Sequence, residues 1–251
     1  YTHGAIETCC SVAWMALSID ALRLTGDPLV ADELELTLWN QALDQQHPSG
    51  NWCTYDTPMN GVRAPSYHQI NFQYRPGTPE LNCCSVNGPR TLGMCSEWAV
   101  MRRANGITVN FYGPGEFDIP YGDQQRIRIV QDTRYPVEGA IRMTLSPETP
   151  IAFALQLRIP AWSRQTTLKL NGTPLNEVPQ PGTYLTIERT WQAGDTLDLQ
   201  LDMTPRLQVG RGPDRGGCGV IHTGPLLLAF DTQFNPVEIG ALPPMNAADR
   251  A

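Results

Sequence analysis

The sequence predicts an α + β protein in which a helical segment precedes an antiparallel β-sandwich. Two observations carry this prediction. Apolar residues recur every three or four positions in the first part of the chain, but they alternate with polar residues after about residue 105. Turn signals such as Asn171-Gly172 and Gly194-Asp195 separate the short alternating runs, which is typical of the strands of a sandwich.

The first two helices are expected to form a hairpin. One helix covers residues 9–24, and Gly26 ends it at the position where helices favour glycine. Asp27 then caps a second helix that has Pro28 at its first position and runs to about Leu43. The apolar stripe of the first helix consists of Val12, Met15, Ala16, Ile19 and Leu22.

A long connection and a third helix follow. Prolines and glycines interrupt every periodicity in residues 45–82, and a loop of this length inside a compact domain is usually functional. The third helix is expected after Pro89, and Asn105-Gly106 is expected to close it. Its apolar stripe consists of Leu92, Cys95 and Ala99.

The rest of the chain predicts strands and a division into three domains. The strands are expected at residues 107–111, 126–129, 141–145, 153–159, 168–170 and 197–201. The domains are a helical domain (1–105), a β-sandwich middle domain (106–209) and the start of a further, incomplete β domain (210–251). We expect Trp162 and Trp191 to pack in the core or between domains rather than to bind sugar.

The composition argues against some classes of partner. The 251 residues carry a net charge of −7, and this argues against nucleic acid as a partner because phosphate binding requires a basic surface. A neutral, sugar-like ligand fits this balance better. No apolar run is long enough to cross a bilayer, so no membrane partner is expected. Because the chain begins at Tyr1 rather than at a methionine, we expect its amino end to be a cut inside a domain.

Seven cysteines point to metal or thiol chemistry. They include two adjacent pairs, Cys9-Cys10 and Cys83-Cys84, and their number is odd. Neither feature resembles the disulfide framework of a small secreted protein. Clustered cysteines in a chain of this size more often bind metal or react, and the cytoplasm is the expected compartment.

Four of the possible ligands fall in two short motifs, Glu7-Thr8-Cys9 and Asn82-Cys83-Cys84. Three thiolates and one carboxylate make a four-coordinate zinc site. The alternative is that the cysteines only pack in the core and that Glu7 is a surface acid. The cysteines expected to stay outside the cluster are Cys10, Cys53, Cys95 and Cys218.

With these motifs the chain resembles glycoside hydrolase family 127, the β-L-arabinofuranosidase-like enzymes of bacteria. The resemblance extends in the family's order over nearly the whole chain. Beyond the two cysteine motifs it rests on Ala31-Asp32, Glu35, Leu38-Trp39-Asn40, Tyr55 with Pro58, Leu157 to Trp162, Trp191 to Asp195 and Gly224-Pro225-Leu226. It implies that residues 1–105 are the carboxyl-terminal part of an (α/α)6 barrel catalytic domain.

The resemblance also implies a retaining glycoside hydrolase that acts on non-reducing-end β-L-arabinofuranosides or a similar sugar, so the expected partner is a glycoside or oligosaccharide. It implies that zinc is bound by Glu7, Cys9, Cys83 and Cys84, and that Cys83 is the nucleophile. Two further residues match sugar-contacting positions of the family, Glu35 and Tyr55. Without the resemblance, these two are better interpreted as a solvated helix acid and a loop aromatic.

Two departures from the family pattern matter. The family's general acid/base is a glutamate ahead of Glu7, and the chain starts after that position, so we expect these 251 residues alone to be inactive. Ser85 follows Cys84 where members usually have proline, and Leu81 replaces a nearby cysteine, which leaves the substrate open.

Two other classes of function stay open at this point. One is a non-catalytic zinc or thiol protein whose β-sandwich binds carbohydrate. The other is a redox-sensing thiol protein, which ranks last because adjacent cysteines seldom close a disulfide ring easily. The sequence makes no prediction about the oligomeric state.

Overall fold

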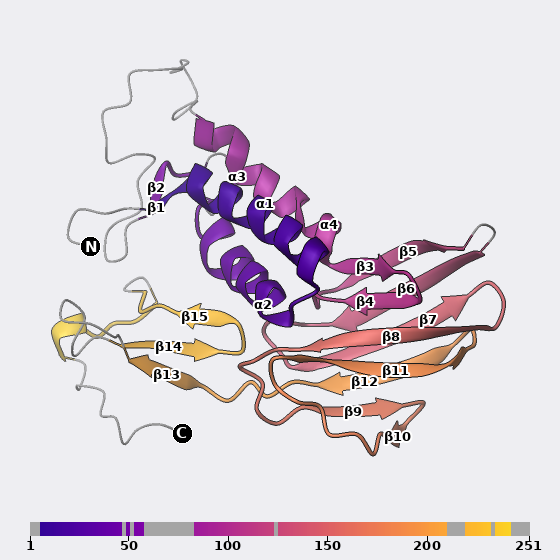
Figure 1. Cartoon of the computed structure of the whole chain (residues 1–251). Helices are drawn as coiled ribbons and strands as arrows, with labels where there is room; N and C mark the ends of the chain where they lie inside the picture. Colours follow the sequence, from indigo (N-terminus) through magenta and orange to yellow (C-terminus); the bar gives the residue numbers. More distant parts are fainter. Residues whose placement is uncertain are drawn as a thin grey trace.

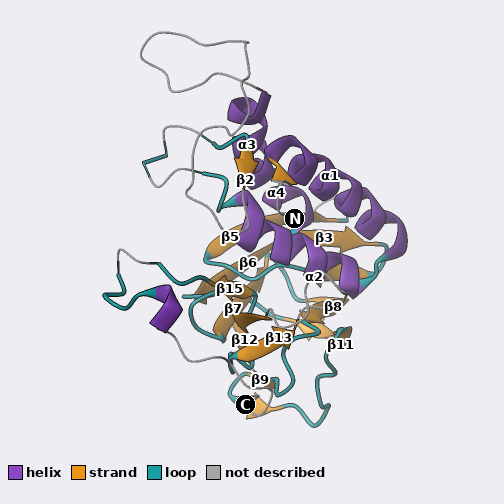
Figure 2. Ribbon diagram, turned by 90° about the vertical axis from the view of Figure 1, so that its left-hand side faces the viewer, coloured by secondary structure: helices purple, strands orange, loops and turns teal. Residues whose placement is uncertain are grey.

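A computed structural model describes residues 6–46, 49–50, 53–57, 83–122, 125–209, 219–231 and 234–241. The helices lie together against one side of a two-sheet β-sandwich, and a small three-stranded sheet extends beside it (Figure 1). A view turned by 90° shows the helices as a layer above the strands (Figure 2). None of the helices in these ranges is long and apolar enough to cross a membrane.

The expected helical hairpin is confirmed. Helix α1 spans Thr8–Thr25 and ends at Gly26, which has a φ of 63° and donates its N–H to the carbonyl of Leu22 at 2.8 Å. Helix α2 spans Pro28–Thr37 and continues as a π-helical turn, Leu38–Ala42. The Asp27 carboxylate caps α2 by accepting the N–H of Leu29 at 2.9 Å.

The prediction for the third helix was wrong at both ends. Helix α3 spans Cys83–Gly93 and contains Pro89. Proline lacks an N–H donor and is best tolerated in the first turn of a helix, so the sequence predicted that the helix begins after Pro89. After a short helix α4 (Cys95–Trp98), the chain turns into a strand, β3 (Val100–Arg103). Asn105 therefore lies in the hairpin turn between β3 and β4 (Gly106–Val109) and does not close a helix. Hairpins and helix ends favour the same Asn-Gly pair.

The sandwich consists of a six-stranded and a four-stranded sheet. In spatial order, the first contains β10 (Thr173–Pro174), β9 (Thr167–Leu170), β12 (Asp195–Gln200), β7 (Ala140–Pro147), β6 (Gln125–Thr133) and β5 (Gly115–Tyr121). The second contains β11 (Thr183–Trp191), β8 (Ile151–Ile159), β4 and β3. All six expected strands are confirmed, but β3, β5, β10 and β11 were missed.

The sequence predicted an antiparallel sandwich, but the structure contains one parallel pair of strands. Strand β4 runs parallel to β8, with Ile107 opposite Leu155. Gly106 allows the two backbones to approach closely, because a Cβ at this position would lie 2.1 Å from the carbonyl oxygen of Ala154. The inward-facing residues of both sheets form one buried core that includes Tyr112 and Trp191.

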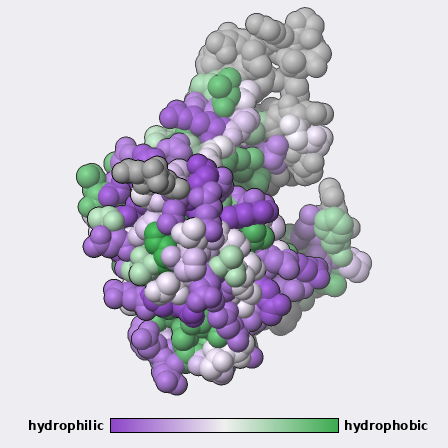
Figure 3. Space-filling view, turned by 90° about the vertical axis from the view of Figure 1, so that its right-hand side faces the viewer, coloured by the Kyte–Doolittle hydropathy of each residue, from purple (hydrophilic) through white to green (hydrophobic). Residues whose placement is uncertain are grey.

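A third sheet lies apart from the sandwich (Figure 1). Its strands are β13 (Arg206–Val209), β14 (Gly219–Thr223) and β15 (Leu226–Leu228), and a 3-10 turn follows at Ile239–Ala241. Figure 3 shows that the opposite end of the molecule is largely hydrophilic, with hydrophobic residues in small separate groups. That surface is ordinary for a folded protein in water.

A buried ionic network joins α2 to the sandwich. Arg158 on β8 is fully buried and contacts the carboxylates of both Asp32 and Glu35, the latter at 2.7 Å. Asp32 also accepts the backbone N–H of Ala161 at 2.9 Å. Trp162 donates its indole N–H to Glu35 at 3.3 Å. The helical part and the sandwich are therefore fixed to each other by charged groups as well as by apolar packing.

The helices within the described ranges make up a hairpin, α3 and a short α4, and they do not amount to a barrel. The (α/α)6 barrel therefore stays a prediction. Most of the long connection, residues 58–82, and part of the Gly-rich stretch, residues 210–218, fall outside the described ranges.

Candidate metal centre

Two of the four candidate ligands lie where α1 begins. Strand β1 (Ile6–Glu7) pairs with β2 (Asp56–Thr57), which places the backbone of Glu7 opposite Asp56. Thr8 donates its N–H to the carbonyl of Tyr55 at 3.0 Å and its hydroxyl to the carbonyl of Thr54 at 2.5 Å. These bonds hold the start of α1 against the 53–57 segment, so Glu7 and Cys9 have fixed positions.

The other two ligands begin α3. Helices α1 and α3 lie side by side, with their first turns at the same end (Figure 1). Gly88 of α3 packs directly on Cys53, because a Cβ on this glycine would lie 2.3 Å from the Cys53 sulfur. The 53–57 segment therefore touches both helices, and it sets their spacing at the point where the cysteines meet.

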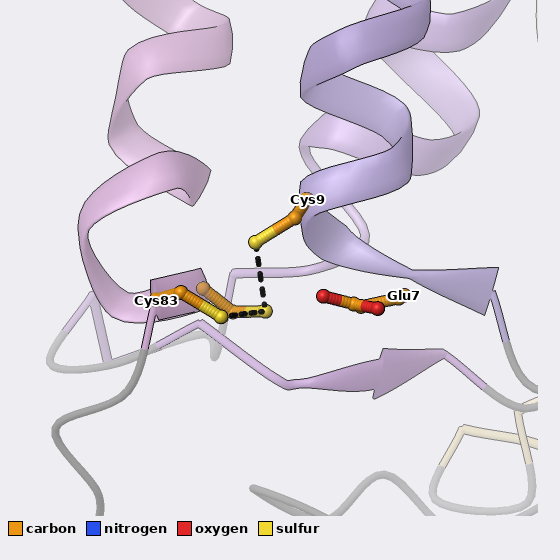
Figure 4. A group of neighbouring side chains, drawn as sticks. Glu7, Cys9 and Cys83 are labelled. Atoms are coloured by element: carbon orange, nitrogen blue, oxygen red, sulfur yellow. Dashed lines mark hydrogen bonds between the residues drawn. The ribbon is translucent and has the colours of Figure 1, made fainter. Parts of the chain in front are cut away.

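The structure brings the four predicted ligands together. The ligand atoms of Glu7, Cys9, Cys83 and Cys84 all lie within 4.8 Å of one another. The Sγ atoms of Cys9 and Cys84 are 3.5 Å apart, and those of Cys83 and Cys84 are 3.9 Å apart. Figure 4 shows the side chains of Glu7, Cys9 and Cys83 pointing toward a common centre.

The other cysteines are placed elsewhere. Cys10 is exposed on α1, Cys53 is buried under α3, and Cys95 lies on α4. Among the cysteines that the structure describes, none of these three belongs to the ligand group. Cys218, which was also expected to stay apart, falls outside the described ranges.

The surroundings of Cys9 and Cys84 raise the pKa of both thiols and so favour their protonated form. Burial raises the pKa of Cys9, although the side-chain amide of Asn87 opposes this shift by donating to the Cys9 sulfur at 3.2 Å. Burial also raises the pKa of Cys84, and the nearby Cys9 and Cys83 sulfurs add to this increase. A bound cation would reverse this preference, because it stabilises the thiolate directly.

The donor set fits one metal ion. Metal–ligand bonds of about 2.0–2.3 Å in a tetrahedral site put neighbouring ligand atoms roughly 3.3–3.8 Å apart. The observed sulfur separations of 3.5 and 3.9 Å are close to this range. The widest pair in the group is within 4.8 Å, so small rotations of the side chains bring all four atoms to bonding distance.

The two expected sugar contacts have different surroundings. Tyr55 lies at the cluster, because its carbonyl oxygen is 4.0 Å from the Cys84 sulfur. Glu35 is completely buried, so the alternative interpretation as a solvated acid is wrong. Its carboxylate accepts bonds from Arg158, Tyr135 and Trp162 of the sandwich. This places Glu35 in the network that joins α2 to the sandwich.

One residue of the centre was missed by the sequence analysis. Asn87 lies four positions after Cys83 on α3, and its amide contacts the Cys9 sulfur. Residues four apart share a helix face, so the spacing was a usable signal once α3 was known to start at Cys83. The sequence analysis predicted that this helix begins after Pro89, so it did not place Asn87 on the same helix as Cys83.

Comparison with known proteins identifies the family. The chain matches the model of the GH127 β-L-arabinofuranosidase catalytic domain over residues 1–97. It matches the model of the GH127 middle domain over residues 106–203. The chain belongs to the GH127 family. The four candidate ligands described above lie wholly in the part of this GH127 chain that matches the catalytic domain.

Solved structures agree with this assignment. One titled as a glycoside hydrolase has 30% identity and a TM-score of 0.78. A GH127 β-L-arabinofuranosidase from Geobacillus stearothermophilus T6 has 25% identity and a TM-score of 0.74. A third, a GH127 β-arabinofuranosidase, has 24% identity and a TM-score of 0.75, and it supports the fold alone. Each match covers 89% of this GH127 chain but only 36–37% of the solved chain. No curated protein is similar enough to count as a match.

Proposed function

We propose that this GH127 chain contributes the zinc site and the nucleophile of a retaining glycoside hydrolase that acts on non-reducing-end β-L-arabinofuranosides or a similar sugar. The observation that carries the proposal is the convergence of Glu7, Cys9, Cys83 and Cys84 on one centre. Because the chain spans little more than a third of the solved relatives, the activity is proposed for the protein that contains the whole catalytic domain.

Zinc is the metal that this donor set favours. Three soft thiolate donors exclude the hard cations Mg²⁺ and Ca²⁺, which prefer oxygen ligands. Glu7, Cys9, Cys83 and Cys84 would hold the ion. When bound, zinc supplies a positive charge that keeps the thiols deprotonated at neutral pH.

Cys83 is the proposed nucleophile because of its exposure. It is the exposed thiol of the cluster, whereas Cys84 is buried and Cys9 is half-buried. The Cys83 sulfur donates an electron pair to the anomeric carbon, forms a C–S bond, and the bond from that carbon to the leaving oxygen breaks. Water then attacks the anomeric carbon from the face that the leaving group had occupied and displaces the sulfur. The two inversions give net retention.

The leaving oxygen takes up a proton, and Glu7 does not supply it in this proposal. A carboxylate that binds a metal is deprotonated and has no proton to give. The family resemblance assigns this step to a glutamate ahead of Glu7, whose carboxylate then takes the proton that the attacking water loses. We therefore expect no turnover from these 251 residues alone. The half-buried Tyr55 beside Cys84 is the better placed of the two proposed sugar contacts.

The remaining features are compatible with a catalytic domain followed by accessory β domains. We propose the boundaries 1–105, 106–209 and 210–251, with the first part contributing to an (α/α)6 barrel. The sandwich has no proposed catalytic role. Its Trp191 is fully buried and Trp162 donates its indole N–H to Glu35, which supports packing roles for both indoles.

The test is an activity assay of the protein that carries this chain with the rest of the catalytic domain. We expect it to hydrolyse an aryl β-L-arabinofuranoside with retention of configuration, read from the first-formed anomer by NMR. Cys83→Ser should lower kcat/KM at least about 10³-fold, the scale of nucleophile loss in other enzymes. Cys10→Ser is the control, because this neighbouring thiol is exposed and outside the cluster. An inverted product, or full activity of Cys83→Ser, contradicts the proposal.

A further inference from the structure

The three thiols of the cluster have unequal surroundings. Asn87 donates its side-chain N–H to the Cys9 sulfur at 3.2 Å. Cys84 is buried, and its sulfur lies 4.0 Å from the carbonyl oxygen of Tyr55. Cys83 is exposed. Three sulfurs of one centre are thus distinguished by a hydrogen-bond donor, by burial and by access to solvent.

We propose that Asn87 is a positioning residue that keeps Cys9 as a permanent metal ligand and so leaves Cys83 as the reactive sulfur. This inference rests on the metal site of the proposed function. It goes beyond that site because it assigns a separate role to each thiol and names the group that separates them.

Helix geometry makes Asn87 suitable for this role. Cys83 and Asn87 are four residues apart on α3, so they share the face that looks toward α1. From that face Asn87 reaches across to Cys9, which belongs to the first turn of α1. A single amide therefore fixes the Cys9 side chain and joins the two helices that supply the sulfurs.

Charge explains why the residue is an asparagine. One carboxylate and three thiolates bring four negative charges to a divalent ion, so the sulfurs stay electron-rich. A neutral N–H donor withdraws electron density from the one sulfur that it contacts and stabilises its charged form. An aspartate of the same shape would instead add a fifth negative charge beside that sulfur.

Metal affinity gives the first test. Zinc binding to the chain is measured by competition with a chromophoric chelator for the wild type, Asn87→Asp and Asn87→Ala. We expect Asn87→Asp to weaken binding about 10–100-fold, the usual effect of losing an outer-sphere partner. Val86→Asp is the matched control, because it adds the same charge one position away, where the side chain is 70% exposed. This control should change affinity less than about twofold, as exposed charges are screened.

Two further readouts separate this role from simple helix tethering. In the cobalt-substituted chain, Asn87→Ala should move the thiolate-to-cobalt charge-transfer band to lower energy, because the Cys9 sulfur becomes more electron-rich. In the zinc-loaded chain, iodoacetamide should label Cys83 first among the three ligand thiols of the wild type, and the share of their label on Cys9 should rise in Asn87→Ala. A tether alone would alter neither the band nor the order of labelling.

Each outcome decides one question. If Asn87→Asp and Val86→Asp bind zinc equally, or if Asn87→Ala leaves the band and the labelling order unchanged, the role of Asn87 is refuted while the metal site stands. If the wild type binds no zinc, the metal site of the proposed function fails and this inference fails with it. Asn87→Ala keeps the test decisive even if the aspartate variant does not fold, because alanine favours helix.

Discussion

The two cysteines of each adjacent pair differ in exposure because neighbouring side chains on a helix point in different directions. Cys9 and Cys10 are consecutive in the first turn of α1, where neighbouring side chains point about 100° apart. Cys9 therefore faces Cys84 at 3.5 Å, whereas Cys10 faces solvent. The same divergence separates exposed Cys83 from buried Cys84 on α3. At the scale of single residues, chemistry follows from which way each thiol points.

A pair of serine variants tests this difference. Cys9→Ser replaces a thiolate ligand by a hydroxyl that stays protonated, so zinc affinity should fall by at least about 10–100-fold, the range known for weaker perturbations of metal sites. Cys10→Ser should leave affinity unchanged, because this thiol lies outside the ligand group. Chelator competition measures both, and equal affinities for the two variants would place the metal elsewhere.

Short motifs were sufficient to predict which four side chains converge, but they did not reveal the surroundings of single side chains. Glu7-Thr8-Cys9 and Cys83-Cys84 each carry two ligands, so two contacts between segments bring four groups together. Glu35 shows the limit, because its partner Arg158 lies 123 positions away in the sequence. No local pattern states that an acid on α2 is buried against a sandwich strand.

Among the elements, α3 depends on a close contact with the 53–57 segment. A Cβ added to Gly88 would lie 2.3 Å from the Cys53 sulfur and 2.7 Å from the Cys53 Cβ. Gly93, at the end of the same helix, has nothing within 4 Å of such a Cβ. One helix thus offers a crowded and an open glycine.

The two glycines predict opposite effects of alanine. Gly88→Ala overpacks the contact and should destabilise the fold by about 1–3 kcal/mol, less the gain in helix propensity. Gly93→Ala should be neutral or stabilise by up to about 1 kcal/mol, because only the unfolded chain loses freedom. Urea unfolding measures both. A stabilising Gly88→Ala would show that Cys53 does not pack on α3 as described.

Element boundaries were predictable where one local rule applied and failed where two rules competed. Gly26 and Asp27-Pro28 punctuate the α1–α2 hairpin without ambiguity. Pro89 and Asn105-Gly106 were misjudged, because proline is allowed inside α3 and Asn-Gly also makes hairpins. Tertiary packing, which the sequence does not display, decided both cases.

In the molecule as a whole, the buried network at Arg158 connects the helices to the sandwich. The guanidinium and the Glu35 carboxylate are both completely buried, and Asp32 is nearly so. Removing the Arg158 guanidinium would leave the carboxylates of Asp32 and Glu35 buried without a positive partner. Arg142, which pairs with Asp198 on the surface, is the contrasting case.

Replacing each arginine by alanine tests the role of this network. Arg158→Ala should lower the free energy of unfolding by about 3–5 kcal/mol, the usual cost of breaking a buried ion pair from one side. Arg142→Ala should leave the urea midpoint unchanged, because its pair is exposed. Similar midpoints for the two variants would contradict a buried junction between the helices and the sandwich.

One zinc ion bound by Glu7, Cys9, Cys83 and Cys84 is the basis of the proposed function. X-ray absorption at the zinc edge of the zinc-loaded chain tests it most directly, because the spectrum reports the number and kind of ligand atoms. The proposed site predicts three sulfurs at about 2.3 Å and one oxygen at about 2.0–2.2 Å. A shell of nitrogen and oxygen alone, or fewer than two sulfurs per zinc, would contradict the claim.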